Sequence, residues 1–161
     1  MNKPIDITGV VLTTARLTLR TWRESDLEDF YAYASVAGVG EMAGWNHHRS
    51  REESRAILSH FLEGKRTFAL EYQGKVIGSL GIEAYSEENY PELSSLQGRE
   101  LGYVLSKAYW GMGLMPEAVK AVTHWLFREE KLDFIIVGHF LRNSQSRRVA
   151  EKCGFLYIWA T

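Results

Sequence analysis

The sequence is poor in cysteine and proline, and it has no long apolar run. Cys153 is the single cysteine, so an intrachain disulfide is excluded. Three prolines among 161 residues leave no room for a Pro-rich linker. No stretch approaches the roughly 18 apolar residues of a membrane span, and Met1–Val11 lacks the apolar region of a signal peptide. These absences predict a cytoplasmic protein that has no contact with a membrane.

The sequence also lacks an excess of charge of either sign. It contains 19 basic and 20 acidic residues, for a net charge of -1. Binding to the nucleic-acid backbone needs clustered positive charge, so nucleic acid is not an expected partner. The adjacent histidines His47 and His48 point apart and lack the spacing of metal ligands, so no metal site is expected. With 45% hydrophobic residues, the chain is predicted to form one domain over residues 1–161.

The pattern of apolar residues predicts a fold that mixes strands with helices. Gln73–Gly74 separates two alternating runs and predicts a tight hairpin turn. Two helices are predicted before this hairpin, a third from Met115 and a fourth over Asn143–Cys153. Interspersed helices and strands predict an α/β (α+β) layer fold with about four helices. Further strands are predicted at Arg16–Thr21, Arg99–Leu105, Phe134–Val137 and Phe155–Trp159.

The segment Tyr109–Glu117 places two glycines, Gly111 and Gly113, between a predicted strand and a predicted helix. Such a loop presents free backbone N–H groups and the positive end of the helix dipole, and phosphates bind there readily. The alternative interpretation is a plain tight turn. The spacing matches neither a P-loop nor a dinucleotide-binding motif.

Near the C-terminus, Asn143–Phe155 is typical of a helix with an Asn cap and a Gly stop at Gly154. Asn143 would serve as a cap whatever the function of the protein. This stretch and the glycine loop are much more specific together than either is alone.

Together with other blocks, these stretches resemble the GCN5-related N-acetyltransferase (GNAT) superfamily, and within it the RimJ/RimL-like branch that modifies ribosomal-protein N-termini. The resemblance covers nearly the whole chain, and the blocks occur in the order and at the spacings usual in the family. They are Ala15–Arg20, Gly74–Ser79, Glu100–Leu105, Tyr109–Gly113, and Asn143, Ser146 and Glu151–Phe155.

The resemblance implies a single GNAT-like domain with a central mixed twisted sheet whose two parallel strands splay apart. It also implies that acetyl-CoA is the co-substrate. In the family, the pyrophosphate lies on backbone N–H groups of the glycine loop, and the pantetheine arm pairs with the preceding strand. The residues that would bind the cofactor here are Val104, Leu105, Trp110, Gly111, Met112, Gly113, Leu114, Asn143 and Ser146.

Acetyl transfer needs a neutral amine, a stabilised oxyanion and a proton for the leaving thiolate. The family places the base on the strand beside the thioester, where Glu100 stands here. Alternation places Glu100 on the strand face opposite Leu101 and Tyr103. Ser146 would lie near the sulfur and protonate it, and a backbone N–H near Val104 or Leu105 would meet the oxyanion. The alternatives are a solvated glutamate and an ordinary helix serine.

The expected function is transfer of an acetyl group to a primary amine, in particular the α-amino group of a protein or peptide. A small-molecule amine as acceptor and a noncatalytic acyl-CoA-binding module remain the alternatives.

Many relatives carry one more strand after the segment that matches Phe155–Trp159. The sequence stops at Thr161, so either that strand is missing or the exposed sheet edge pairs in a homodimer.

Overall fold

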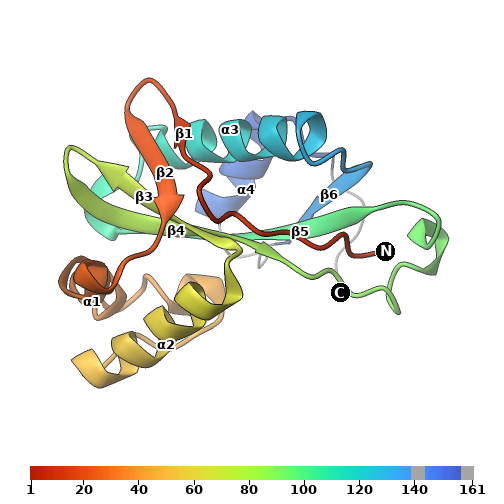
Figure 1. Ribbon diagram of the computed structural model, residues 1–161. Helices are drawn as coiled ribbons and strands as arrows, with labels where there is room; N and C mark the ends of the chain where they lie inside the picture. Colours follow the sequence, from red (N-terminus) through yellow and green to blue (C-terminus); the bar gives the residue numbers. More distant parts are fainter. Residues whose placement is uncertain (139–143, 157–161) are drawn as a thin grey trace.

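The computed structural model describes residues 1–138 and 144–156, and within them the chain forms six strands and four α-helices. Figure 1 shows their arrangement. In chain order they are β1 (Leu12–Thr13), β2 (Leu17–Thr21), α1 (Leu27–Ala34), α2 (Arg51–Gly64), β3 (Thr67–Tyr72), β4 (Lys75–Glu83), β5 (Gly98–Leu105), α3 (Leu114–Arg128), β6 (Phe134–Val137) and α4 (Ser144–Lys152).

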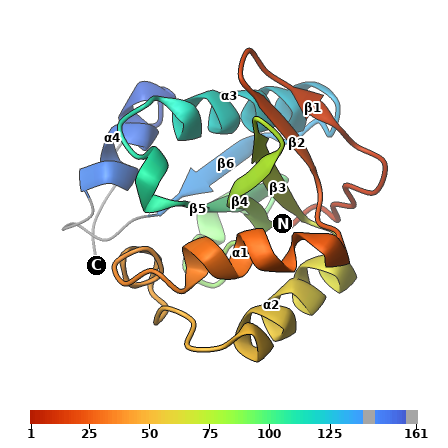
Figure 2. The same ribbon diagram turned by 90° about the vertical axis from the view of Figure 1, so that its left-hand side faces the viewer.

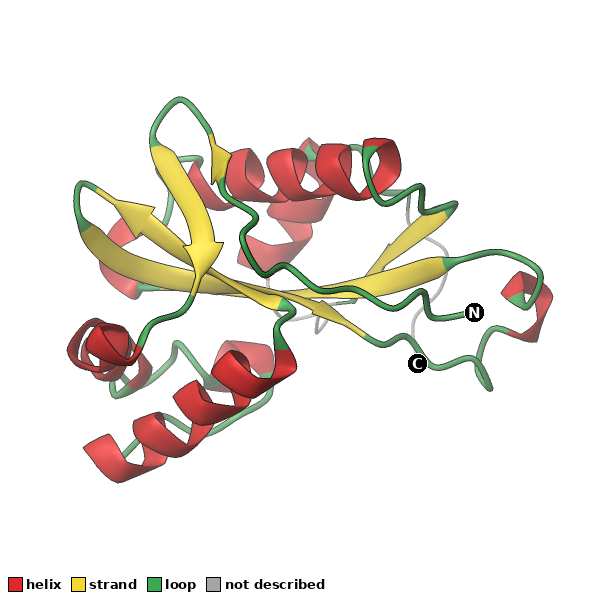
Figure 3. Ribbon diagram, in the orientation of Figure 1, coloured by secondary structure: helices red, strands yellow, loops and turns green. Residues whose placement is uncertain are grey.

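The six strands form one sheet in which spatial order equals chain order, from β1 to β6. Neighbouring strands are antiparallel, except that β5 and β6 run parallel. Parallel neighbours need a crossover connection, and α3 provides it (Figure 3). The mixed sheet with four flanking helices, expected from the family resemblance, is confirmed.

The helices cover both faces of the sheet. α3 and α4 lie on one face, and α1 and α2 lie on the other (Figures 1 and 2). Between the sheet and α3 lies the larger core, with Phe68, Leu80 and Leu126 among its buried side chains. A smaller cluster around Trp22 and Phe30 packs under α1 and α2. In the described part of the chain, no helix has both the length and the apolarity needed to cross a bilayer.

The predicted turn at Gln73–Gly74 is confirmed. Gln73 has a φ of 50° and Gly74 a φ of 79°. A two-residue hairpin whose twist matches the strands needs positive φ at both positions, and glycine adopts it without steric cost.

At the C-terminal end, α4 stops at the predicted glycine. Gly154 has a φ of 81°, and its N–H donates to the Glu151 carbonyl at 3.1 Å. The N–H of Phe155 donates to the Ala150 carbonyl at 3.1 Å, which completes a Schellman ending. The strand predicted over Phe155–Trp159 does not begin at Phe155 or Leu156, and its other residues lie outside the described part of the chain. Asn143, the predicted cap of this helix, also lies outside the described part.

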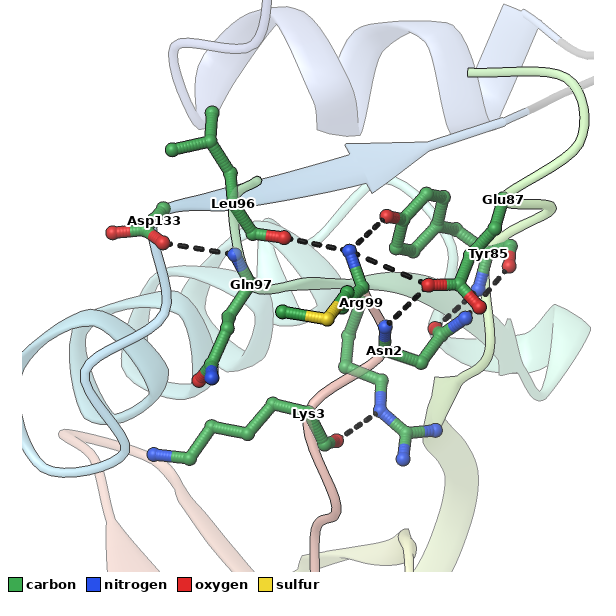
Figure 4. Close-up of polar contacts among 9 residues, drawn as sticks. Asn2, Lys3, Tyr85, Glu87, Leu96, Gln97, Arg99 and Asp133 are labelled. Atoms are coloured by element: carbon green, nitrogen blue, oxygen red, sulfur yellow. Dashed lines mark hydrogen bonds and ion pairs between the residues drawn. The ribbon is translucent and has the colours of Figure 1, made fainter. Parts of the chain in front are cut away.

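The start of β5 is bonded on both sides. Beyond the end of β4, Asn2 forms a parallel bridge with Gly98, and its side-chain amide exchanges two 2.9 Å hydrogen bonds with the Tyr85 backbone (Figure 4). On the β6 side, the N–H of Gln97 donates to the Asp133 carboxylate at 2.8 Å, and the N–H of Asp133 donates to the Gln97 carbonyl at 2.8 Å. β5 and β6 therefore begin as a closely bonded pair.

A buried ion pair joins β2 to the turn before α1. The guanidinium of Arg20 donates to both carboxylate oxygens of Asp26, at 2.9 and 3.0 Å. The side chains are 8% and 7% exposed. Asp26 also accepts the N–H of Arg23 at 2.7 Å, and Arg20 reaches Glu71 of β3 at 3.2 Å. The carboxylate thus fixes where the chain leaves the sheet and enters α1.

Replacing Asp26 with alanine leaves the Arg20 charge buried with a weaker set of partners. Removal of one partner of a buried ion pair typically costs about 3–5 kcal/mol, and we expect the free energy of unfolding to fall by that amount. Urea unfolding followed by circular dichroism measures it. Glu28→Ala is the matched control, because the Glu28–Arg51 pair is 67% and 55% exposed and should contribute about 0–1 kcal/mol. Equal losses in the two variants would contradict the prediction.

Candidate active site

The two parallel strands, β5 and β6, are paired only along the first half of β5. β6 ends at Val137, opposite Leu101, whereas β5 continues to Leu105. Among the described residues, no strand pairs with Gly102–Leu105 on the β6 side. The family resemblance predicted that the parallel strands splay apart, and in the structure their pairing ends at Leu101 and Val137. The end of the pairing leaves an opening beside the second half of β5.

The backbone groups that face this opening belong to Tyr103 and Leu105. On the other side of β5, the N–H of Ser106 donates to the Ile77 carbonyl of β4 at 2.7 Å. In an antiparallel pair, residues alternate between those whose N–H and C=O point to the partner strand and those whose groups point away. Ser106 and Val104 therefore bond to β4. Tyr103 presents its N–H and C=O to the opening, and Leu105 presents its N–H, because the Leu105 carbonyl accepts the indole N–H of Trp110.

A partly open pocket lies at the same place. It brings together Val104, Leu105, Trp110 and Ser146, four of the residues predicted to bind the cofactor. Apart from backbone groups and Ser146, its lining is largely apolar. The remaining lining residues come from the segment before α2, from β5, and from α3 and α4. They are Val39, Met42, Ala43, Tyr103, Met115 and Val149.

The glycine loop adjoins this pocket, because Trp110 before it and Met115 after it line the wall. Gly111 and Gly113 have φ values of 79° and 76°, in the left-handed region that favours glycine. α3 begins directly after Gly113. Among the described residues, nothing accepts a hydrogen bond from the backbone N–H groups of the loop and the first two helical residues. These free donors, at the positive end of a helix, form a site suited to an anion.

Three predicted loop residues have distinct roles. The indole Nε1 of Trp110 donates to the Leu105 carbonyl at 2.8 Å and ties the loop to the end of β5. Leu114 is buried in the core, so only its backbone N–H can meet a ligand. The Met112 side chain is exposed, and packing therefore does not hold it in place.

Glu100 lies deeper in the sheet than the pocket. Leu101 belongs to the core on the α3 side, so alternation places Glu100 on the face of α1 and α2, as predicted. It stands opposite Glu83 of β4, and burial, together with the charge of Glu83, raises the pKa of Glu100. Its carboxylate lies against Gly138, where a Cβ would be 3.2 Å from Oε1. Glu100 does not line the pocket, and about 13 Å of strand separates it from Val104.

Ser146 lies in the pocket wall beside Tyr103. The Tyr103 hydroxyl donates to the Ser146 carbonyl at 3.2 Å, which ties β5 to the first half of α4. Burial and the neighbouring Cys153 raise the pKa of Tyr103, against the effect of the bond to Ser146. Asn143 lies outside the described residues, so its contact with the cofactor stays a prediction.

The other candidate groups have structural partners. Nδ1 of His47 lies 2.9 Å from the Glu41 carboxylate, and Nδ1 of His48 lies 2.7 Å from the Ser54 hydroxyl. Burial raises the pKa of the Cys153 thiol, which disfavours a nucleophilic thiolate. Within residues 1–138 and 144–156, no three His, Cys, Asp or Glu side chains gather to hold a metal ion.

Sequence reasoning missed Tyr103 and the segment Val39–Ala43 as parts of the site. Strand alternation could have placed Tyr103 on the correct side of β5, but only if the end of β6 had been known to fall at Val137. The segment Val39–Ala43 has no motif, and it joins the pocket only because the fold carries it beside β5.

Known proteins share this architecture. A family described as acetyltransferase (GNAT) domain matches residues 16–156. A Bacillus subtilis (strain 168) protein named "Probable N-acetyltransferase YjcK" is 48% identical over 113 residues, covering 63% of this chain and 62% of that protein. The match therefore spans less than two thirds of this relative.

Solved structures agree with the family match. The crystal structure of an acetyltransferase (GNAT family) from Bacillus anthracis has a TM-score of 0.78 at 25% identity, covering 90% of this chain and 82% of its own. A RimL ribosomal L7/L12 alpha-N-protein acetyltransferase in complex with coenzyme A has a TM-score of 0.70 at 19% identity, covering 89% and 82%, and shows the shared fold. Because the family match extends over residues 16–156, most of this chain, the chain belongs to the GNAT acetyltransferase family.

Proposed function

We propose that this protein transfers the acetyl group of acetyl-CoA to a primary amine, in particular the N-terminal α-amino group of a protein or peptide in the cytoplasm. The observation that carries the proposal is the junction of two sets of free backbone groups. The N–H and C=O of Tyr103 and the N–H of Leu105 face the opening left by β6, and the glycine loop follows β5 after the single turn Lys107–Tyr109. An extended amide chain that ends in phosphates fits this combination, and coenzyme A has that structure.

The binding mode follows from the geometry. The pyrophosphate would lie on the N–H groups of Gly111–Leu114, and an amide of the pantetheine arm would pair with the backbone of Tyr103, which leaves the N–H of Leu105 for the reacting carbonyl. The thioester would then enter the pocket beside Val104 and Ser146. The coenzyme A complex of the RimL protein, whose fold this chain shares, supports the same co-substrate.

In the proposed reaction, the amine nitrogen attacks the thioester carbonyl carbon, and the carbon–sulfur bond then breaks. The N–H of Leu105, which faces the opening, donates to the developing oxyanion. The hydroxyl of Ser146 gives a proton to the departing sulfur and regains one from solvent. The proton lost by the amine reaches Glu100 through water, because Glu100 lies about 13 Å along the strand from Val104.

The face that carries Glu100 suits an amine acceptor. Gly81 and Gly102 lie opposite each other on β4 and β5, and the Glu83 side chain lies over them. Glu83 pairs with Arg66 at 3.1 Å, and Glu100 stands opposite Glu83. The carboxylate of Glu100 attracts an ammonium group. An α-amino group has a pKa near roughly 8 and a lysine near roughly 10.4, so the α-amino group gives up its proton more readily to Glu100. The predicted homodimer plays no part in this mechanism and stays a prediction.

Binding of acetyl-CoA should depend on Gly113. At 100 times its Kd, a ligand that binds only the folded state adds about 2.7 kcal/mol of stability, which raises Tm by about 5–10 °C in a chain of this size. Gly113→Val should abolish this shift, because a side chain is strained at a φ of 76° and its Cβ would lie 3.5 Å from Nη2 of Arg16, so the loop has to change shape. Differential scanning fluorimetry measures both proteins.

Gly9→Val is the matched control for this experiment. Gly9 also has a φ of 76°, but nothing lies within 4 Å of the position of its Cβ. The control should suffer a similar backbone strain while keeping the full acetyl-CoA shift. Equal ligand shifts in the Gly113 and Gly9 variants would remove the glycine loop from the binding site.

Glu100→Gln keeps the shape of the side chain and removes the proton acceptor. We expect kcat near pH 7 to fall by about 100- to 10,000-fold with little change in acetyl-CoA affinity. The deficit should shrink as pH rises, because more of the amine is then already deprotonated. In the wild type, the acidic limb of kcat should lie above the ordinary glutamate pKa, since the pKa of Glu100 is raised.

The measurement is kcat against pH with one amine for wild type, Glu100→Gln and Glu92→Gln. Glu92 is an exposed glutamate outside the site and should leave the profile unchanged. A glutamate with a purely structural role would lower kcat by the same factor at every pH.

The acceptor is tested by acetyl-CoA-dependent thiol release with three amines. These are a short peptide with a free N-terminus, the same peptide with a blocked N-terminus and one lysine, and spermidine. Near pH 7.5 the free α-amine is neutral roughly 200-fold more often than lysine, and kcat/KM should be higher for the free N-terminus than for the lysine peptide. Preference for spermidine would favour a small-molecule acceptor, and cofactor binding without turnover of any amine would favour a noncatalytic module.

A further inference from the structure

We propose that Arg16, which precedes β2, is a positioning residue for the phosphate-binding glycine loop. By holding the Met112 carbonyl, Arg16 fixes the direction in which the N–H of Gly113 points. The inference rests on the proposed binding of acetyl-CoA at this loop. It assigns a function to a residue that is far from the loop in sequence and outside the pocket.

The contacts join three segments. Nη1 of Arg16 donates to the Met112 carbonyl at 2.8 Å, and Nε donates to one oxygen of Glu117 at 2.9 Å. The other oxygen of Glu117 accepts the backbone N–H of Arg16 at 2.9 Å and the hydroxyl of Thr14 at 2.6 Å. Glu117 lies in the first turn of α3. The turn between β1 and β2 is thereby bonded to both the loop and the helix that follows it.

Glu117 anchors the guanidinium. Its side chain is 19% exposed, against 39% for Arg16. Burial tends to raise the pKa of Glu117, but the hydrogen bonds from Thr14 and Arg16 outweigh it and lower the pKa. Glu117 therefore stays ionised at neutral pH and holds Arg16 in one orientation.

The effect on the loop follows from the planarity of the peptide bond. In a trans peptide, the C=O of one residue and the N–H of the next point in opposite directions. With the Met112 carbonyl directed at Arg16, the N–H of Gly113 must point away from the guanidinium. The chain has no cis peptide bond among its described residues, so this relation holds here.

Without this contact, little would fix that peptide plane. It joins Met112 to Gly113, and the backbone of Gly113 has more conformational freedom than that of other residues. The Met112 side chain is exposed and unsupported by packing. A loop that must offer N–H groups to a phosphate loses affinity if one plane rotates, so a residue that holds the plane contributes to binding without touching the ligand.

Arg16→Lys tests the proposal conservatively. Lysine keeps the charge but lacks the planar fork that reaches Glu117 and Met112 together. Loss of a hydrogen bond to a charged group corresponds to roughly a 10- to 100-fold loss of affinity. We expect the Kd of acetyl-CoA to rise by that factor, and the Kd of S-acetylpantetheine, which lacks the phosphates, to change by less than about twofold. Titration calorimetry measures the first and ligand-observed NMR the second.

Arg51→Lys is the control, because Arg51 pairs with Glu28 on α1, away from the loop, and both Kd values should be unchanged. If the role of Arg16 were purely structural, Arg16→Lys would raise the Kd of acetyl-CoA and the Kd of S-acetylpantetheine by the same factor. An unchanged Kd for acetyl-CoA would leave Arg16 with no role in binding. Either result overturns the proposal. If the wild type itself binds acetyl-CoA and S-acetylpantetheine with equal affinity, the glycine loop does not bind the phosphates. The proposed binding mode then fails independently of Arg16.

Discussion

The parallel ladder between β5 and β6 stops halfway along β5, and the rest of the site depends on that stop. The two strands are bonded at their starts through Gln97 and Asp133, yet β6 ends opposite Leu101. Backbone groups left unpaired inside a protein are costly. Those of Tyr103 and the N–H of Leu105 are tolerated because they border a pocket, where water or a ligand can pair with them. An incomplete sheet thus becomes a template for an extended substrate.

The glycine loop has to satisfy two opposing requirements. Glycine allows the positive φ values at Gly111 and Gly113 and a close approach to a phosphate, but it also makes the loop free to change conformation. The side chains that restrain the loop come from outside it or from its edge. Trp110 bonds to the end of β5, and Arg16 bonds to the Met112 carbonyl from the start of β2. The binding loop is therefore kept in shape by the sheet on which it sits.

Sequence reasoning succeeded where the deciding interactions are local. The turn at Gln73–Gly74, the strand at Phe134–Val137 and the stop at Gly154 follow from φ preferences and apolar patterns within a few residues. It failed for the start of the strand predicted at Phe155, because a strand needs a partner and an apolar run does not reveal one. The face that Glu100 occupies was also predictable, since alternation along a strand is a local property.

By itself, the sequence determined the family, the order of the elements from β2 to α4 and the position of the glycine loop. These depend on motifs and on periodicity, which are written into neighbouring residues. Only the tertiary structure decided that Tyr103, and not Val104, turns its backbone to the opening, that Val39–Ala43 completes the pocket, and that Arg16 reaches Met112. Each of these depends on how segments far apart in the chain are brought together, because strand register and side-chain contacts form only when the sheet assembles.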